Sequence, residues 1–260
     1  GSRTARRFRP QPHLKRAGAE RRSGDGAQGA ALARPAHAAA RAKAPRRAGG
    51  ERREFEAMQV RYFFSLMSPY AYLAGLRLEE IAAARGVAVA YRPFDAPTVF
   101  AATGGLPVAQ RHPARRAYRL QDLRRRAHAA RAPLILEPPH YPVDAGLAAT
   151  ALLAAQAAGL SVGPAAHSLL RAVWADGGDL GDPTVVEAAL RRGGVDPEAF
   201  APQPCAAISA ALYEASTREA IDAGVFGSPF YIFGEERFWG QDRLDDLDGH
   251  LRDAAEEPIR

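Results

Sequence analysis

The sequence has few of the residues that several common kinds of site require. Cys205 is the single cysteine among 260 residues, so a disulfide within the chain is impossible. It lies in a proline-rich approach to a helix and outside any motif, which is typical of a small structural residue rather than a nucleophile. No apolar run approaches the ~20 residues that a membrane-spanning helix needs. Lysine is absent after Lys43, so arginine supplies all the strongly basic side chains of the remaining chain.

Acidic and basic residues are divided unevenly along the chain. Residues 1–57 carry 15 Lys and Arg against 5 Asp and Glu, whereas residues 58–260 carry 20 against 24. The net charge of +6 therefore comes from the first segment, and the larger part is mildly acidic. Nucleic-acid binding loses its main electrostatic support, so we expect neither a nucleic acid nor a membrane as a partner.

Residues 1–57 are rich in Ala, Arg, Gly and Pro and contain almost no aromatic or β-branched residues. Such a composition buries too little apolar surface to offset the entropy of ordering, so we predict a disordered basic extension. Gly1 and Ser2 are typical of an expression-tag remnant, and Met58 is placed like a start residue. The extension is interpreted as the product of an upstream start site or as a tail without a fold. A mitochondrial transit peptide and a basic arm for nucleic acid or acidic membrane remain alternatives.

A strand that leads directly into a helix is predicted for Val60–Ala74. Its β-branched and aromatic residues end at Ser68-Pro69, where an apolar pattern with helical spacing begins and continues toward Gly86. Ser68 is a preferred N-cap residue, and Pro69 suits the first helical position. The Ser68 hydroxyl is thus expected where free N–H groups and the helix dipole favour an anion, including a thiolate. Ordinary helix capping is the alternative explanation of the same dipeptide.

A second motif lies near the end of the chain. Gly224–Phe233 combines a glycine-bounded loop, the dipeptide Ser228-Pro229 and a β-type run. Arg237–Leu244 then adds a short strand and the start of a helix. This ββα ending follows an opening βαβ unit that is completed by a strand at Val87–Phe94. Together they give the outline of a thioredoxin fold.

The two motifs, SPYAYLA at residues 68–74 and GVFGSP with FWGQDRL at residues 224–244, resemble the family of 2-hydroxychromene-2-carboxylate isomerases. This family is related to kappa-class glutathione transferases and to DsbA-type oxidoreductases. The resemblance runs from about Met58 to the C-terminus. It implies an α/β protein with a thioredoxin-like fold and a large all-helical insertion.

The domain organisation follows from this resemblance. The thioredoxin-like domain is expected at residues 58–260, formed by residues 58–96 and 224–260, with the helical insert at residues 97–223 between them. The insert shows helical patterning at Arg115–Arg131, Gly146–Ala158, Ala165–Trp174, Thr184–Arg192 and Ala206–Ala223. Strands at Phe230–Phe233 and Glu236–Phe238 and a helix from Gln241 to about Ala255 complete the prediction.

In DsbA-type relatives the first helix begins with a Cys-x-x-Cys pair, and the matching positions here are Ser68 and Ala71. Because both sulfurs are missing, thiol–disulfide exchange is chemically unavailable at this site. The resemblance implies glutathione as the cofactor, with Ser68 as the catalytic residue that stabilises its thiolate. No histidine stands near Ser68 to act as a base, and no histidine pair has metal-ligand spacing, so neither a covalent serine nor a metal is expected.

The resemblance also implies how glutathione is held. Ser228 and Pro229 match the thioredoxin-fold proline, whose peptide bond is typically cis and whose preceding residue pairs through its backbone with the cysteinyl peptide. Asp242 would meet the γ-glutamyl ammonium, and free amides at the start of the last helix would meet the carboxylate. Helix capping and a core tryptophan are the alternative. The expected cofactor-binding residues are Ser68, Ser228, Pro229, Trp239, Gly240, Gln241 and Asp242.

Substrate contacts are expected from Tyr70, Gly105, Arg115 and Asp144. Three positions depart from the family pattern, since Gly105 and Asp144 stand where Asn is common and Arg126 stands where an aromatic residue is common. These departures leave the glutathione half of the site recognisable and alter the substrate half. The candidates for holding a substrate carboxylate are Arg92, Arg111, Arg115 and Arg116.

The implied activity is the glutathione-dependent isomerisation of a 2-hydroxychromene-2-carboxylate to a trans-o-hydroxybenzylidenepyruvate, in aromatic degradation. Glutathione thiolate would add to the unsaturated ring, and the ring would open. The adduct would then rotate about the former double bond, and glutathione would be expelled unchanged. A kappa-like glutathione S-transferase and a non-catalytic thioredoxin-like binding module are the alternatives. The resemblance further implies a cytoplasmic homodimer that acts on a small aromatic electrophile.

Overall fold

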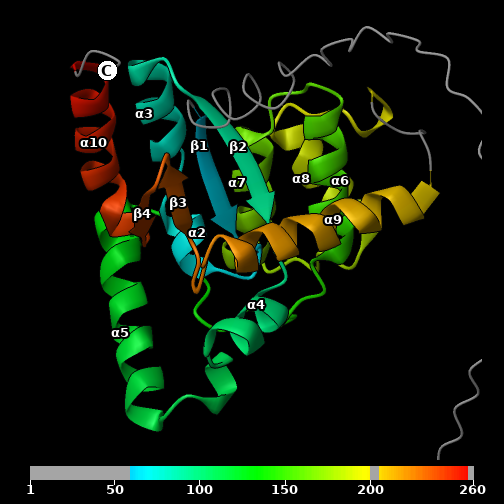
Figure 1. The fold of residues 1–260 in the computed structure, drawn as a ribbon. Coiled ribbons are helices and arrows are strands. Elements are labelled where there is room, and N and C mark those ends of the chain that lie inside the picture. The colour runs from blue at the N-terminus through cyan, green and yellow to red at the C-terminus, as the bar shows by residue number, and fades with distance from the viewer. Residues whose placement is uncertain (1–58, 200–204, 257–260) are drawn as a thin grey trace, which may run out of the picture. The chain divides into compact units, whose positions relative to one another are not determined.

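The computed structural model describes residues 59–199 and 205–256. The predicted disorder of residues 1–57 and the interpretation of Met58 lie outside these ranges. The described residues form one four-stranded sheet in the order β2, β1, β3, β4 (Figure 1). Its strands are β1 (Gln59–Phe64), β2 (Ala88–Pro93), β3 (Phe230–Phe233) and β4 (Glu236–Trp239).

Strand direction in this sheet is mixed. β1 and β2 run parallel, with Tyr62 opposite Tyr91, as a βαβ crossover requires. β3 pairs antiparallel with β1 and with β4, placing Phe230 opposite Trp239. Segments at the two ends of the described chain therefore meet at the centre of one sheet. The α/β thioredoxin-like fold predicted from the motifs is confirmed, with a βαβ unit at one end and a ββα unit at the other.

Helices cover both faces of the sheet (Figure 1). They are α2 (Pro69–Leu73), α3 (Arg77–Arg85), α4 (Ala96–Thr103), α5 (Pro113–Ala130), α6 (Gly146–Ala157), α7 (Gly163–Trp174), α8 (Pro183–Arg192), α9 (Cys205–Asp222) and α10 (Leu244–Glu256). Three short 3₁₀ turns are η1 (Val108–Gln110), η2 (Pro197–Ala199) and η3 (Gln241–Arg243). None of these helices, within the described ranges, is both long and apolar enough to cross a membrane.

Alternation along β1 divides the core between the two faces. Tyr62 and Phe64 point into the larger core, which they share with α2, α3, α6, α7, α8 and α10. Phe63 points the other way, into a smaller core with α4 and α9. Tyr62 stacks on Phe64 and Tyr231 with ring centroids 4.5 and 5.1 Å apart. The strand is thus buried on both faces, which is why it reads as an almost continuous apolar run.

The structure agrees with the five helices predicted in the insert to within a few residues at each end, and it adds one. α4 was missed, although Asp95 and Pro97 give it an N-cap and a proline in its first turn. The single helix predicted from Pro69 toward Gly86 is wrong, because Gly75 adopts a positive φ of 63° and separates α2 from α3. The helix predicted from Gln241 begins instead as the 3₁₀ turn η3, which leads into α10.

Candidate active site

Ser68 lies at the junction between β1 and α2, as the sequence predicts. Its backbone is extended, and its Oγ accepts a hydrogen bond from the Ala71 N–H at 3.2 Å, which is the geometry of an N-cap. The same hydroxyl donates to the Ser228 carbonyl oxygen at 3.0 Å. Ser68 is nearly buried, with 9% of its surface exposed to solvent. Ser68 therefore caps α2 and also contacts the second motif through the same hydroxyl.

The loop before β3 faces Ser68. The Ser228-Pro229 peptide bond is cis, as the resemblance implied. Ser228 also contacts the segment just before the first motif: its Oγ accepts a hydrogen bond from the buried Ser65 N–H at 2.9 Å. The Ser228 N–H has no acceptor among the described residues. It is thus available to a ligand, whereas the carbonyl oxygen of the same residue already accepts the Ser68 hydroxyl.

The short length of α2 changes the electrostatic argument. The dipole expectation assumed a helix that continued toward Gly86, but α2 ends at Leu73 after five residues. A helix of little more than one turn aligns few peptide dipoles, so its field at Ser68 is small. Any stabilisation of an anion beside Ser68 must therefore come mainly from hydrogen bonds by nearby donors, including the hydroxyl.

The turn after β4 supplies the second group of predicted cofactor residues. Gly240 caps η3 with a φ of 115°, and its N–H donates to the Pro229 carbonyl oxygen at 3.0 Å. This bond ties the turn to the loop that faces Ser68. Gln241 and Asp242 are the first residues of η3, so their N–H groups have no partner inside the turn. Two open amides and a carboxylate are therefore grouped here.

A cavity of about 1200 Å³ joins these groups. Seven of the predicted site residues on the two motifs line it: Ser68, Tyr70, Ser228, Trp239, Gly240, Gln241 and Asp242. Gly105 and Arg115 line it from the insert. Pro229 is not part of the lining and acts through the peptide bond and carbonyl described above. The structure thus brings the two motifs, about 160 residues apart in sequence, to one cavity.

Asp144 does not lie in this cavity. Its Oδ1 accepts a hydrogen bond from the Gly146 N–H at 2.9 Å, where α6 begins. The contact that the structure gives Asp144 is therefore one with the start of a helix, and its expected substrate contact stays a prediction. Arg92 also lies elsewhere, because its Nε pairs with Glu219 Oε2 at 2.7 Å.

Gly105 shapes the cavity because it has no side chain. A Cβ at this position would lie 2.7 Å from the Phe100 ring, so only glycine leaves that ring where it is. A larger side chain here would push Phe100 aside. Because Phe100 also lines the cavity, the cavity has an aromatic surface from α4 at this place.

Tyr70 belongs to a polar chain that the sequence did not reveal. Its hydroxyl donates to Asp122 Oδ2 at 3.0 Å, and Asp122 Oδ1 lies 3.7 Å from Arg126 Nε. Arg126 Nη2 in turn lies 3.3 Å from Asp242 Oδ2. Burial, followed by the Asp122 contact, raises the pKa of Tyr70 to about 12, so the phenol stays protonated. Only the fold could show this chain, because α2, α5 and η3 are far apart in sequence.

A cluster of arginines faces the cavity from the insert. Arg111, Arg115 and Arg119 all line it. Burial lowers the pKa of Arg111, and the neighbouring charges of Arg119 and Arg115 lower it further. Like charges held close together in a partly enclosed cavity repel one another, and a bound anion would reduce this repulsion. Arg119 was missed by the sequence analysis, although it is four residues from Arg115 and so on the same helix face.

Trp239 is an exposed residue and not the core residue of the alternative explanation. Its side chain is 55% exposed, and its indole packs edge-on against Phe226 with ring centroids 4.9 Å apart. The close approach of this indole to Gly227 leaves no room for a side chain there, since a Cβ would lie 2.2 Å from Trp239 Nε1. An exposed aromatic surface beside the open amides is typical of a ligand site.

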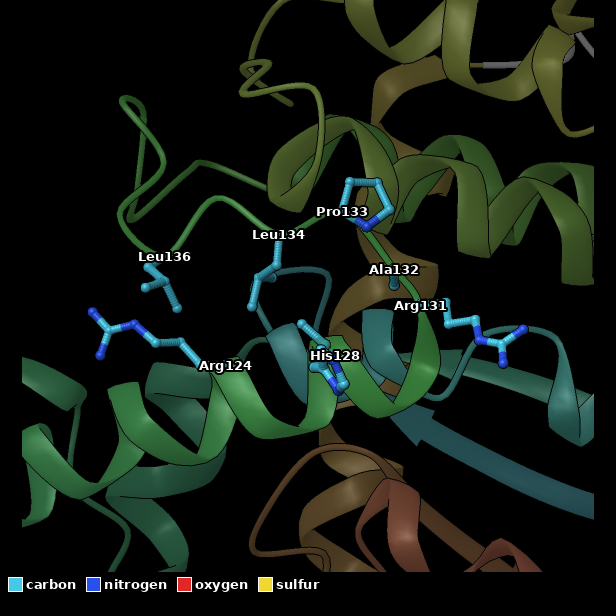
Figure 2. Close-up of a pocket in the computed structure, with 8 residues that line it drawn as sticks. Arg124, His128, Arg131, Ala132, Pro133, Leu134 and Leu136 are labelled. Atoms are coloured by element: carbon cyan, nitrogen blue, oxygen red, sulfur yellow. The ribbon is translucent and has the colours of Figure 1, made fainter.

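A second cavity, of about 750 Å³, lies at the C-terminal end of α5. Arg124, His128 and Arg131 line it together with Leu134 and Leu136 from the segment that follows (Figure 2). None of the residues predicted to bind cofactor or substrate reaches it. Basic side chains at a helix C-terminus complement the helix dipole, which explains their presence there. The larger cavity is thus the candidate active site.

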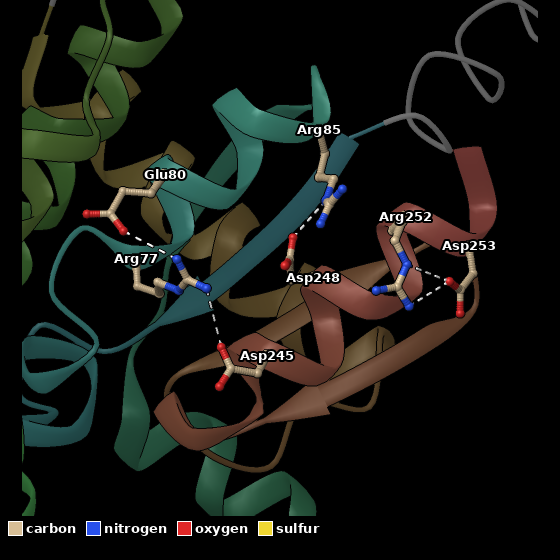
Figure 3. Close-up of polar contacts among 7 residues, drawn as sticks. All are labelled: Arg77, Glu80, Arg85, Asp245, Asp248, Arg252 and Asp253. Atoms are coloured by element: carbon tan, nitrogen blue, oxygen red, sulfur yellow. Dashed lines mark hydrogen bonds and ion pairs between the residues drawn. The ribbon is translucent and has the colours of Figure 1, made fainter. Parts of the chain in front are cut away.

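α10, which follows η3, is joined to α3 by ion pairs (Figure 3). Arg85 Nε lies 2.7 Å from Asp248 Oδ1, and this hydrogen bond lowers the pKa of Asp248. Arg77 Nη2 lies 3.4 Å from Asp245 Oδ1. Leu244, Leu247 and Leu251 bury the inner face of the same helix. Apolar packing, with ion pairs at its edge, therefore holds the turn that carries Asp242 against the sheet.

The sheet topology, the serine N-cap and the cis proline opposite it define a protein of the thioredoxin-fold class. The model of the family described as "DSBA-like thioredoxin domain" matches residues 59–252, so the chain belongs to this family. Within it, the chain is similar to two proteins called 2-hydroxychromene-2-carboxylate isomerase. The protein from Sphingobium xenophagum is 28% identical over 195 residues, which cover 75% of this chain and 98% of that relative. The protein from Pseudomonas sp. strain C18 is 31% identical over 192 residues, which cover 71% and 86%.

A solved structure of a 2-hydroxychromene-2-carboxylate isomerase agrees with this grouping. It superimposes with a TM-score of 0.59 at 25% identity and covers 76% of this chain and 96% of its own. The probable DsbA oxidoreductase SCO1869 from Streptomyces coelicolor superimposes with a TM-score of 0.58 at 18% identity, which shows the shared fold alone. The family resemblance predicted from the two motifs is confirmed.

Proposed function

We propose that the chain is a glutathione-dependent isomerase of the 2-hydroxychromene-2-carboxylate type. The observation that carries this proposal is the position of the Ser68 hydroxyl. It lies in the cavity between an amide that it accepts from and a carbonyl that it donates to. Because neither Ser68 nor Ala71 is a cysteine, the site does not support disulfide exchange, and an external thiol is the natural ligand for the hydroxyl.

The cavity offers groups that fit glutathione. The open N–H of Ser228 suits a peptide carbonyl, and the open amides of η3 suit a carboxylate. Asp242 offers a carboxylate to an ammonium. When bound, glutathione supplies a thiol whose thiolate is a reversible nucleophile toward conjugated double bonds.

Ser68 and Ser228 would act together on that thiolate. A hydroxyl has one proton, and in this structure Ser68 donates it to the Ser228 carbonyl oxygen. A peptide N–H of the ligand that bonds to this carbonyl would take the place of Ser68. The Ser68 proton would then be free to turn toward the sulfur. Binding of the peptide part and stabilisation of the thiolate would thus be coupled through one carbonyl oxygen.

The insert would hold the substrate. Its arginine cluster suits a carboxylate, and Phe100 and Phe226 offer apolar surface to an aromatic ring. Tyr70 stays protonated and lies two residues from Ser68, but its one proton is donated to Asp122 Oδ2, so it would have to turn from Asp122 to donate to a developing phenolate. A cytoplasmic homodimer acting in aromatic degradation is part of the proposal and is supported by the family resemblance alone.

The test is turnover of 2-hydroxychromene-2-carboxylate with glutathione at one tenth of the substrate concentration. An isomerase converts all the substrate and returns the glutathione, whereas a kappa-like transferase stops when the glutathione is consumed. Ser68→Ala should lower kcat/KM about 100-fold, the typical loss for one donor to a developing anion. Full activity of Ser68→Ala would overturn the role of the hydroxyl. A wild-type protein that neither binds nor turns over would favour a non-catalytic binding module.

A further inference from the structure

The carboxylate of Asp242 is already paired in this structure. Arg126 Nη2 from α5 lies 3.3 Å from its Oδ2, and Arg243 Nη2 lies 3.9 Å from the same oxygen. Arg126 and Asp242 come from α5 and η3, which are 116 residues apart in sequence, so the fold brings this pair together. Both Arg126 and Asp242 line the active-site cavity. A ligand ammonium that pairs with Asp242 Oδ2 would therefore compete with Arg126 for this oxygen.

Arg126 is also held from the other side. Its Nε lies 3.7 Å from Asp122 Oδ1, and the Asp122 side chain is only 14% exposed and fixed by the Tyr70 hydroxyl. Arg126 itself is 42% exposed and Asp242 is 36% exposed. A guanidinium has five N–H donors in a planar fork, so the two carboxylates leave donors of Arg126 unused. Arg126 is therefore anchored to α5 at one edge and open to the cavity at another.

We propose that Arg126 is a specificity-determining residue that binds the carboxylate of an α-amino-acid head group while Asp242 binds its ammonium. The inference rests on the proposed function, since the γ-glutamyl end of glutathione carries such a head group. The amino and carboxylate groups of an α-amino acid are attached to the same carbon and so are neighbours, as Arg126 and Asp242 are. The predicted carboxylate contact with the η3 amides is thereby joined by a charged partner.

Charge balance favours a zwitterion over either ion alone. Opening the Arg126–Asp242 pair for an ammonium alone would leave the guanidinium without this partner. A zwitterion replaces one ion pair with two and adds no net charge to the cavity. Because the existing pair is half-exposed, separating it costs little. Each new contact is a charge-assisted hydrogen bond, and a carboxylate can engage the guanidinium fork through two bonds.

The experiment is calorimetric titration of the full chain with glutathione and with γ-aminobutyryl-cysteinyl-glycine, which lacks the α-carboxylate. Arg126→Gln should weaken glutathione binding about tenfold and change the affinity for the carboxylate-free peptide less than twofold. Arg124→Gln is the matched control, because Arg124 lies two residues away on α5 and lines the other cavity. Arg126→Lys, which keeps the charge and loses the fork, should give an intermediate loss and serves if Arg126→Gln does not fold.

Each outcome decides between the two roles that Arg126 can have. Equal weakening for both peptides, or tighter glutathione binding by Arg126→Gln, would overturn the inference, because Arg126 would then only support the site or block Asp242. Saturable wild-type binding with either of these results leaves the proposed function intact. Absence of glutathione binding to the wild-type protein would instead remove the proposed function, and the inference with it.

Discussion

The two sides of the active-site cavity are built in different ways. On the thioredoxin side, formed by the cavity residues before Ala96 and from Phe226 onward, short hydroxyl and backbone contacts join Ser68, Ser228 and Ser65. On the insert side, formed by the cavity residues between these limits, long arginine side chains face the cavity, and Asp122 accepts a hydrogen bond from Tyr70 on the opposite side. The buried serine contacts of the first side are part of the fold, so we expect changes there to lower stability. The second can change its ligand preference while the fold is kept.

The largest expected effect tests the thioredoxin side. Ser228→Ala removes the acceptor of the Ser65 N–H, and Ser65 is only 3% exposed. A buried donor left without a partner costs about 2 kcal/mol in the free energy of unfolding. Chemical denaturation should show this loss, and Ser228→Thr, which keeps the hydroxyl, should recover most of it. Unchanged stability in Ser228→Ala would mean that this side is not more tightly bound into the fold than the other.

The next prediction concerns the insert side. Arg111→Ala should raise KM for a carboxylate substrate about tenfold, because a charge-assisted contact is lost. Stability should change by less than about 0.5 kcal/mol, since burial beside Arg119 and Arg115 already disfavours the charged form of Arg111. Steady-state kinetics and denaturation on the same samples would check both points. Arg116→Ala, five residues further along on α5 and outside the cavity lining, is the control and should alter neither.

The smallest expected effect concerns Glu79, which is on neither side of the cavity. It tests whether pH changes the stability of the fold without changing the activity of the site. Burial raises the pKa of Glu79, although its Oε1 accepts a hydrogen bond from the Tyr91 hydroxyl at 2.7 Å. The folded protein therefore binds this proton more tightly than the unfolded chain. The resulting stability is present below the ordinary carboxyl pKa and is lost as pH rises through the raised value.

Glu79→Gln should accordingly flatten the dependence of the melting temperature on pH above the ordinary carboxyl range. The pH profile of kcat/KM should keep its shape, because Glu79 does not line the cavity. Thermal melts of both proteins from pH 4 to pH 8 would measure the difference. A parallel shift of the two melting curves at every pH would show that ionisation of Glu79 does not contribute.

The thioredoxin side could be predicted from sequence because local chemistry determines it. Ser68 before Pro69 starts a helix whatever surrounds it, and the two motifs resemble a known family. The break at Gly75 escaped the prediction, since a glycine inside an apolar pattern is compatible with a continuous helix as well as with a turn. The start of α4 could have been recognised from Asp95 and Pro97.

The insert side could be predicted only in part. Helical spacing locates α5, but spacing does not say which of its many arginines face a cavity. The contacts of Asp122 with Tyr70 and of Arg126 with Asp242 join segments 52 and 116 residues apart. Asp144 lies outside the cavity lining, and an aspartate two residues before a helix is equally suited to bond the first backbone amides, as Asp144 does here.

The position of Trp239 has a practical consequence. The chain has two tryptophans, of which Trp174 has 0% and Trp239 has 55% exposure. A small quencher such as acrylamide should therefore suppress emission from Trp239 and spare Trp174. A ligand seated in the cavity should shield Trp239, whereas unfolding should expose both. The natural protein thus carries its own optical probe for occupancy of the site, distinct from the signal of its core.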